Sequence, residues 1–393
     1  MRVLVFTTMF PTEVDPVSGV FIHNEVEQLR SAGLDVHVVV PTLFVPPFSK
    51  KYSHLTSALK NKVNTQKRIY FSAPNWKFPT IAGFTLGRLL KKSIQIIKPD
   101  IVHIHTAFPC SLALLFSGKV GCPLVVTSHG SDWYKAIPHT STFKKLKSAL
   151  AFADSILAVG GKLRTSIQTE LPEISNRIST QHHGIDLGMF PLTEDRNFFK
   201  QKLVLDTNKP LILTIANRSP EKGIDFLLES IACNEQLRSI PCVIIGKRGN
   251  EAYEVKLRRI IQEHALNAVQ VWDAIPHETL PDWYRAADVY VQPSRSEGFG
   301  IAIIEAAATG CPVVATQCGG PEETVTKNVG NLVPFGDKKQ LAESIVSMVE
   351  NKTWDRQKER AEIELRFDKK KKTESLVNHY KELIHAYHTA QKK

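Results

Sequence analysis

Short apolar, β-branched runs recur along the first half of the chain, and helical periodicity follows most of them. The runs that predict strands lie at 3–7, 36–40, 101–105, 124–128, 155–159 and 178–181. The stretches that predict helices lie at 21–32, 86–97, 142–151 and 162–169. Near-continuous apolar strands that alternate with helices are typical of a parallel sheet covered on both faces.

The second half restarts this alternation after a polar segment at 184–210. Its predicted strands are 211–216, 242–245, 268–272, 289–292 and 313–316, and its predicted helices are 225–233, 251–264, 278–287 and 302–308. The pattern predicts an α/β fold of two tandem doubly wound, Rossmann-like domains that face a central cleft. We expect domains at 1–185 and 186–368 and a C-terminal helix at 369–393 that packs back on the first domain.

Residues 41–80 depart from the alternation. They contain Pro46, Pro47, Pro74 and Pro79 together with Lys50, Lys51, Lys60, Lys62, Lys67 and Arg68. We expect an irregular, basic insertion in the first domain that binds the acceptor or docks on a surface.

The net charge is unevenly distributed. It is +11 overall, and the first 185 residues hold 21 Lys and Arg against 10 Asp and Glu, so the remainder is balanced. An anionic partner of the first domain, either a phosphorylated acceptor or an acidic membrane face, would explain the excess, and so would a basic surface that only promotes solubility. No helix-turn-helix, zinc-finger or RNA-binding pattern accompanies the charge, which argues against nucleic acid as a partner.

Other features bear on location and metal binding. No apolar run approaches the roughly 18 residues needed to cross a bilayer, and the opening residues 2–6 are too short and too soon charged for a signal peptide. Six cysteines without C-x-x-C spacing indicate a reducing compartment. We expect a cytoplasmic protein, with peripheral membrane contact left open. No metal site is expected, because there is no D-x-D pair and His182–His183 and the pair His103 and His105 lack partners at ligand spacing.

The strongest chemical signal is residues 293–306, Pro-Ser-Arg-Ser-Glu-Gly-Phe-Gly-Ile-Ala-Ile-Ile-Glu-Ala. Glu297 ends a predicted strand, Glu305 lies in the following helix, and Gly298 and Gly300 stand at the helix start, where backbone N–H groups attract anions. Glu297 can reach sugar hydroxyls and Glu305 can bind a ribose diol. Either glutamate alone is compatible with a solvated helix charge, but Gly-Phe-Gly between two acids has no packing rationale. The segment therefore predicts a site for a phosphate-linked sugar.

This segment resembles the Glu-x7-Glu signature of glycosyltransferase family 4, whose members are retaining enzymes of the GT-B fold. Other segments resemble further family motifs in the family's order: residues 9–11 with 18–20, 34–38, 128–132, 183–186, 220–223 and 319–323. The resemblance runs from residue 1 to about residue 350. It implies a nucleotide-diphosphate sugar donor, UDP-linked by family habit, and a glycan or glycolipid acceptor in polysaccharide, lipopolysaccharide or glycolipid biosynthesis.

The resemblance also implies roles for individual residues. Lys222 would bind the donor diphosphate and stabilise charge on the leaving group, with help from Arg218, which stands one position from the family's arginine. Gly19 would leave room for the donor phosphate or the acceptor, His129 would face the donor sugar, and His183, which replaces a family Asn, is assigned no contact. The implied catalytic residues are Lys222, Glu297, His129 and Arg218. The implied donor-binding residues are Gly19, Lys222, Arg218, Lys247, Glu297, Gly298, Phe299, Gly300, Ile301 and Glu305.

The implied chemistry needs neither a metal nor another cofactor. No carboxylate can be named as the nucleophile of a double displacement, and the resembling family is thought to substitute at the front face of the sugar. Two other functions stay open. One is a sugar-nucleotide 2-epimerase of the same architecture, which would convert the donor without an acceptor, and the other is a non-catalytic subunit that holds a nucleotide-sugar. A dinucleotide oxidoreductase is disfavoured, because no G-x-G-x-x-G follows the first strand.

Overall fold

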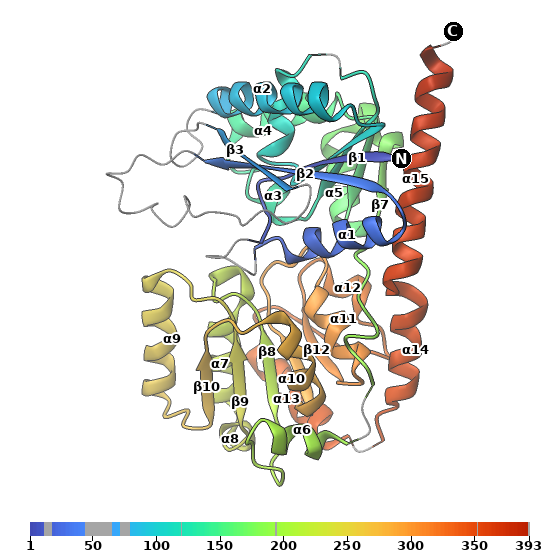
Figure 1. The fold of residues 1–393 in the computed structure, drawn as a ribbon. Helices are drawn as coiled ribbons and strands as arrows, with labels where there is room; N and C mark the ends of the chain where they lie inside the picture. Colours follow the sequence, from blue (N-terminus) through green and yellow to red (C-terminus); the bar gives the residue numbers. More distant parts are fainter. Residues whose placement is uncertain are drawn as a thin grey trace. The chain divides into compact units, whose positions relative to one another are not determined.

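The computed structural model describes residues 1–11, 18–43, 65–70, 79–118, 120–192, 195–351 and 353–391, with the backbone alone at residues 43 and 65–70. The chain falls into two compact units (Figure 1). Unit 1 comprises Met1–His183 and Lys370–Lys393, and unit 2 comprises Gly184–Lys369. The domain ends expected from the sequence, at residues 185 and 368, differ from these by two residues and by one.

Unit 1 is built on a seven-stranded sheet in which all neighbouring strands run parallel. The order is β3-β2-β1-β4-β5-β6-β7, with β1 at Arg2–Phe6, β2 at Asp35–Leu43, β3 at Thr65–Tyr70, β4 at Ile101–His105, β5 at Leu124–Ser128, β6 at Ser155–Ala158 and β7 at Ile178–Thr180. Every residue of β4 and β5 is buried. Strands that are buried on both faces are mostly apolar, and the polar side chains of these two strands, His103, His105, Thr127 and Ser128, are buried with the rest.

Helices cover both faces of this sheet (Figure 1). They are α1 (Val20–Ser31), α2 (Pro79–Ile97), α3 (Ser131–Tyr134), α4 (Thr140–Leu150), α5 (Gly161–Glu170) and most of α15 (Lys369–Gln391), with 3-10 turns at Cys110–Leu115 and Pro172–Arg177. Ile22 and Val26 of α1 pack with Val3 and Val5 of β1 in one core cluster. The spacing of four residues between Ile22 and Val26 places both on the buried face of the helix.

The C-terminal helix α15 belongs to the core of unit 1. Leu376 and Tyr380 lie in the same cluster as Val3 and Val5, and Tyr380 is fully buried. The prediction that this helix packs back on the first domain is therefore confirmed.

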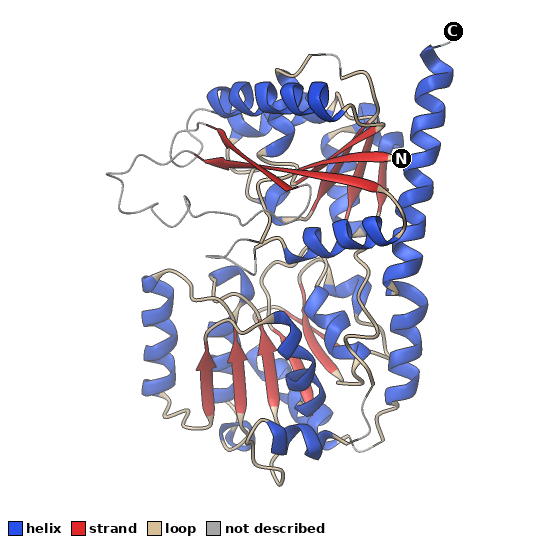
Figure 2. Cartoon of the chain, in the orientation of Figure 1, coloured by secondary structure: helices blue, strands red, loops and turns tan. Residues whose placement is uncertain are grey.

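Unit 2 is built on a six-stranded parallel sheet flanked by helices (Figure 2). The order is β10-β9-β8-β11-β12-β13, with β8 at Ile212–Ile215, β9 at Cys242–Ile245, β10 at Val269–Trp272, β11 at Val289–Gln292, β12 at Val313–Gln317 and β13 at Gly330–Pro334. Its helices are α6 (Arg196–Lys202), α7 (Ile224–Ala232), α8 (Glu235–Arg238), α9 (Glu251–Glu263), α10 (Leu280–Ala286), α11 (Ile301–Ala308), α12 (Pro321–Thr324), α13 (Lys338–Glu350) and α14 (Arg356–Phe367), with 3-10 turns η5 (Pro220–Lys222) and η6 (His277–Thr279). The prediction of two tandem doubly wound α/β domains is confirmed.

The strand order of unit 2 reverses between β8 and β11. β9 and β10 lie beyond β8, whereas β12 and β13 lie beyond β11. The loops that follow β8 and β11 therefore leave the sheet side by side, at the point where open α/β sheets bind ligands. These loops carry Lys222 and residues 293–300, so the topology alone brings the two strongest sequence motifs together.

The structure also corrects the sequence analysis. The stretch 41–80, expected to be irregular, contains the end of β2, the edge strand β3 and the start of α2, while the remainder of it lies outside the described residues. The pattern analysis placed no strand or helix between 316 and 369 of the second domain, where the structure has β13, α13 and α14. In the part of the chain that the structure describes, no helix has the length and apolarity that a bilayer crossing requires.

Candidate active site

The segment between β11 and α11 forms one side of the candidate site. Gly300 begins α11 with φ of +92°, and it supplies no side-chain cap to the helix. A Cβ atom at Gly300 would lie 2.8 Å from Cδ1 of Ile303, so both the backbone conformation and the space favour glycine. The first amides of α11 are thus left for an anion.

Lys222 and Glu297 contact each other between the loops that follow β8 and β11, where the strand order of unit 2 reverses. Lys222 Nζ lies 2.6 Å from Glu297 Oε2, and the two side chains are 27% and 15% exposed. Glu297 Oε1 accepts a hydrogen bond of 3.1 Å from the Gly298 amide. The carboxylate therefore lies between the lysine and the start of the glycine segment, in a partly open position.

Gly223 allows the Lys222 turn to approach β11. It has φ of +64°, and a Cβ atom there would lie only 1.9 Å from the Pro293 carbonyl oxygen. The amides of Arg295 and Ser296 donate to the Glu221 carbonyl, at 2.8 and 3.3 Å. The lysine turn and the glycine segment are thus held against each other by backbone contacts.

Gly320 supports the glycine segment from the other side. Its amide donates to the Glu297 carbonyl at 2.7 Å, and a Cβ atom at Gly320 would lie 2.4 Å from Cα of Phe299. Phe299 is 3% exposed, and its ring packs edge-on against Phe367 with centroids 5.5 Å apart. Only the backbone of Phe299 can therefore contact a ligand in this conformation.

Glu305 is buried, and its carboxylate is oriented by two side chains that sequence reasoning missed. Oε1 lies 2.9 Å from His277 Nε2, and Oε2 accepts a hydrogen bond of 2.9 Å from the Tyr284 hydroxyl. Burial lowers the pKa of His277, but the hydrogen bond and charge of Glu305 outweigh it and raise the pKa above its ordinary value. A carboxylate accepts about four hydrogen bonds, so Glu305 can still accept from a ligand.

Arg218 is almost fully enclosed by its own unit. It is 4% exposed, and its guanidinium donates to Glu254, to Asp273 and to the carbonyls of Gly246 and Trp272. These contacts use four of the five guanidinium N–H groups. A direct contact of Arg218 with phosphate stays a prediction, and what the structure shows is an arginine that fixes the ends of β9 and β10.

Lys247 lies in an exposed loop that follows β9. Its carbonyl accepts a hydrogen bond of 2.9 Å from the Arg218 amide. Glycines on both sides permit this approach, because Cβ atoms at Gly246 and Gly249 would each lie 1.8 Å from a carbonyl oxygen, that of Ala216 and that of Arg218. The loop thus lies beside the segment that leads from β8 to Lys222.

The predicted residues of unit 1 occupy the carboxyl end of its sheet. Gly19 caps the N-terminus of α1 with φ of +69°, and a Cβ atom there would lie 2.5 Å from the Met9 carbonyl oxygen. Residues 12–17 of the same loop lie outside the described residues. Gly19 is required by this backbone approach, whatever else it contacts.

His129 follows β5 and is held by other histidines. Its Nε2 lies 3.3 Å from His105 Nδ1, and its Nδ1 lies 3.3 Å from His183 Nε2. The carboxylate of Asp132 accepts a 2.9 Å hydrogen bond from the His129 amide, which orients the loop. Burial, reinforced by the neighbouring histidines, holds the pKa of His129 well below its ordinary value, so the ring is neutral at pH 7.

The structure brings a third side chain to His103 and His105, for which the sequence shows no partner at ligand spacing. Glu25 of α1 lies 3.3 Å from His105 and 3.8 Å from His103, although 78 residues separate it from His103 along the chain. Sequence spacing cannot reveal this group, because it joins a helix and a strand that meet only in the folded unit.

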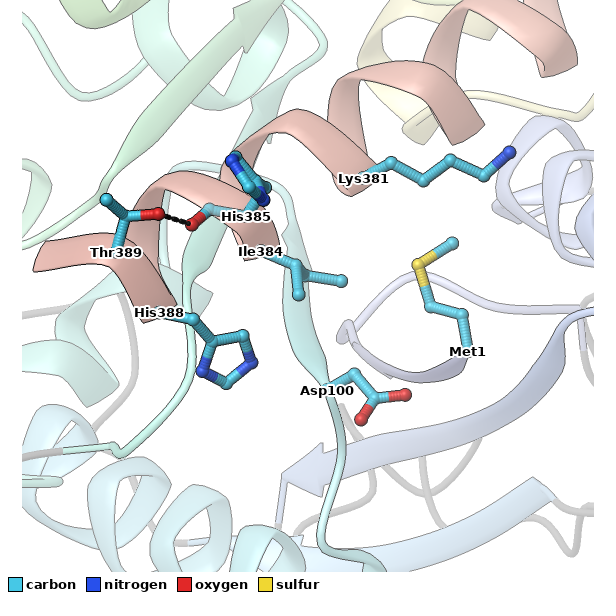
Figure 3. Close-up of a pocket in the computed structure, with 7 residues that line it drawn as sticks. All are labelled: Met1, Asp100, Lys381, Ile384, His385, His388 and Thr389. Carbon is cyan, nitrogen blue, oxygen red and sulfur yellow. Dashed lines mark hydrogen bonds between the residues drawn. The ribbon is translucent and has the colours of Figure 1, made fainter. Parts of the chain in front are cut away.

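Two surface cavities lie away from these residues. One, of about 420 Å³, lies beside the C-terminal half of α15 and is lined by Met1, Asp100, Lys381, Ile384, His385, His388 and Thr389 (Figure 3). Another, of about 400 Å³, is lined by Asn234, Glu343, Val346, Ser347, Glu350 and Asn351 of unit 2. Neither contains a residue of the candidate site.

Tandem doubly wound units, one of which carries a lysine turn and a glycine-led helix at its switch point, define a class of sugar-transferring enzyme with the GT-B fold. Comparison with known proteins supports this class. Residues 195–365 match the family described as glycosyl transferases group 1, and residues 18–188 match the family described as glycosyltransferase family 4. The chain is a glycosyltransferase of the GT-B fold.

Individual relatives agree over most of their length. TuaC of Bacillus subtilis, named for teichuronic acid biosynthesis, is 28% identical over 373 residues, which cover 90% of each chain. The lipopolysaccharide core biosynthesis mannosyltransferase LpsB of Rhizobium meliloti is 29% identical over 338 residues, which cover 81% of this chain and 88% of LpsB. The structure of Anabaena HepE in complex with UDP-glucose superposes with a TM-score of 0.75 at 18% identity, covering 98% of this chain and all of HepE.

Proposed function

We propose that the protein is a retaining, metal-independent hexosyltransferase of glycosyltransferase family 4. Its donor is a UDP-linked sugar, and its acceptor is a glycan or glycolipid in polysaccharide or lipopolysaccharide biosynthesis. The observation that carries this proposal is the 2.6 Å pair of Lys222 and Glu297 beside the start of α11.

The diphosphate is assigned to Lys222 and the first amides of α11. Lys222 is only 27% exposed, so its charge is less screened than that of a surface lysine. The helix adds amide donors and the positive end of its dipole, both of which favour an anion. Lys247 is assigned to the same phosphates from the neighbouring loop, and Arg218 is assigned to support that loop.

The sugar and the ribose are assigned to the two glutamates. Glu297 stands beside Lys222, where its carboxylate can accept hydrogen bonds from sugar hydroxyls. Glu305 lies two helical turns further on and is oriented by His277 and Tyr284. A carboxylate with unused acceptor capacity, held in one orientation, suits the adjacent hydroxyls of a ribose.

The proposed reaction is a substitution on one face of the sugar. The bond between the anomeric carbon and the β-phosphate oxygen breaks, and the acceptor oxygen bonds to the anomeric carbon on the same face. The acceptor proton passes to the departing phosphate, so the products are the glycoside and UDP. Lys222 and the α11 amides stabilise the negative charge that develops on the phosphate.

The donor base and the acceptor class are inferred from relatives. HepE binds UDP-glucose, TuaC is named for teichuronic acid biosynthesis and LpsB for lipopolysaccharide core biosynthesis. We infer a uridine nucleotide and a surface-glycan acceptor for this chain. In unit 1 we assign His129 to the donor sugar, and Gly19 to the phosphate or the acceptor.

Peripheral membrane contact is assigned to one face of α2. Ile81 and Phe84 are 50% and 44% exposed, and Arg88, Lys91 and Lys92 are exposed further along the same helix. Exposed apolar groups beside cations suit an anionic membrane surface. Binding of the protein to anionic vesicles should fall as salt is raised, and Phe84→Ser should weaken it further; binding that is absent or insensitive to salt would remove this assignment.

A panel of nucleotide-sugars tests the proposed function. UDP-sugars should raise the melting temperature of the wild-type protein, whereas GDP-, ADP- and CMP-sugars should leave it unchanged. Formation of a glycoside with the donor's anomeric configuration then confirms retaining transfer. Conversion of the donor without an acceptor would instead show an epimerase, and binding without turnover would show a non-catalytic subunit.

A further inference from the structure

A histidine-rich cluster in unit 1 is not used by the proposed reaction. His103 and His105 project from the same face of the central strand β4, because they are two residues apart. Glu25 reaches them from α1. Its Oε1 lies 3.3 Å from His105 Nε2 and 3.8 Å from His103 Nδ1, and these three atoms all lie within 4.8 Å of one another. The side chains of His103 and His105 are 0% and 1% exposed, and that of Glu25 is 19% exposed.

Two atoms at the centre of the cluster have unfulfilled bonding capacity. Glu25 Oε1 and His105 Nε2 are buried and lie 3.3 Å apart, and among the described residues neither has a hydrogen-bond partner other than the other. A buried pair of acceptors with no proton or ion between them is destabilising. Since a carboxylate oxygen and an imidazole lone pair repel each other, a positive group between them would relieve this cost.

The opposite ring nitrogens are already engaged. His103 Nε2 lies 2.7 Å from the Thr127 hydroxyl, and His105 Nδ1 lies 3.3 Å from His129 Nε2. Protons placed on these outer nitrogens leave lone pairs on the inner ones, the arrangement that outer hydrogen bonds impose on metal-binding histidines. The inner nitrogen of His103 lies 2.5 Å from the Tyr380 hydroxyl of α15, so an ion at the cluster has to replace this hydrogen bond.

We propose that Glu25, His103 and His105 bind a divalent transition-metal ion, with Zn²⁺ as the best match. Two imidazoles and one carboxylate suit Zn²⁺, whereas Ca²⁺ and Mg²⁺ prefer oxygen ligands throughout. Bonds of about 2.0–2.1 Å in a tetrahedron place ligand atoms about 3.3 Å apart, as Glu25 and His105 are. The distance from Glu25 to His103 is half an ångström longer than this, and Glu25, the least buried of the three, is the side chain best able to adjust.

The ion would join α1 to the middle of the unit 1 sheet. It has no part in the proposed transfer, for which no metal is required. The loss of this site and the loss of the proposed function are therefore separately observable.

Zinc binding to the full chain tests the proposal. The protein, freed of any affinity tag and treated with a chelator, should bind one Zn²⁺ per chain in a calorimetric titration and melt at a higher temperature once loaded. Glu25→Gln keeps the size of the side chain and should weaken binding at least tenfold. His139→Gln, which changes an exposed histidine of the same unit, should bind as the wild type does.

Co²⁺ provides a second measurement that does not depend on stability. The Co²⁺-loaded protein should show visible d–d absorption that disappears when Zn²⁺ is added, and His105→Gln should abolish it. Absence of stoichiometric binding would overturn the proposal. Equal Zn²⁺ affinity in the wild type, Glu25→Gln and His105→Gln would overturn it too, because surface histidines would then be the ligands.

Discussion

Replacement of Lys222 by alanine should separate catalysis from stability. Lys222 and Glu297 are 27% and 15% exposed, and a partly exposed ion pair contributes only about 0.5–1 kcal/mol to folding. For a unit of this size, such a loss lowers the melting temperature by about 1–4 °C. The transition state loses far more, because the phosphate then develops charge beside an unpaired Glu297 instead of a lysine.

The expected loss of turnover follows from this electrostatic role. Removal of one preorganised group that stabilises a developing charge reduces kcat by about 100- to 1000-fold, or about 3–4 kcal/mol. Initial rates of UDP release with a UDP-sugar and an acceptor would measure it. Lys338→Ala is the matched control, because Lys338 lies 2.7 Å from Glu229 in an ion pair elsewhere in unit 2, and it should keep wild-type rates.

Two outcomes would refute this reasoning. Lys222→Ala with wild-type kcat/KM would show that the lysine does not contact the reacting phosphates. A large fall in melting temperature that parallels the loss of activity would show that Lys222 maintains the fold rather than the chemistry.

Three further predictions concern the same site. Glu305→Gln should weaken UDP binding by about 10- to 150-fold in calorimetry, since a hydrogen bond to a charged group contributes about 1.5–3 kcal/mol. An unchanged Kd would place the ribose elsewhere. Gly223 has φ of +64° and a Cβ atom there would lie 1.9 Å from the Pro293 carbonyl oxygen, whereas Gly336 has φ of +99° and nothing within 4 Å of such an atom. In urea unfolding, Gly223→Ala should therefore lose at least about 2 kcal/mol of the free energy of unfolding, and more than Gly336→Ala loses. Equal losses would contradict the steric overlap at Gly223. Because the pKa of His277 is raised, its charge stabilises the fold fully below about pH 6.5 and less as pH rises through the raised pKa. The difference in free energy of unfolding between wild type and His277→Gln should therefore shrink toward high pH. A difference that does not depend on pH would count against the contact with Glu305.

The sequence predicted the strands and helices that have a clear period. The segments 101–105 and 124–128 coincide with β4 and β5, because apolar, mainly β-branched residues fill three of the five positions in each, as is typical of strands buried on both faces. The strand Thr65–Tyr70 was missed because only Ile69 and Tyr70 are strongly apolar. Edge strands tolerate such polar sequences, so pattern alone does not distinguish them from loops.

The candidate site was foreseen in its motifs but not in its contacts. Pro220–Gly223 and residues 293–306 stood out because glycines and charges gather there without a packing reason. No pattern in the sequence indicates that Glu254 and Asp273 enclose Arg218, or that His277 contacts Glu305. Such partners come from elements that are far apart in the sequence, and only the fold of unit 2 brings them together.

The most direct test is a crystal structure of the protein with UDP bound. We predict that the diphosphate lies within hydrogen-bonding distance of Lys222 Nζ and of the first amides of α11, with the ribose hydroxyls on Glu305. A diphosphate seated elsewhere on unit 2, or on unit 1, would contradict the proposed function.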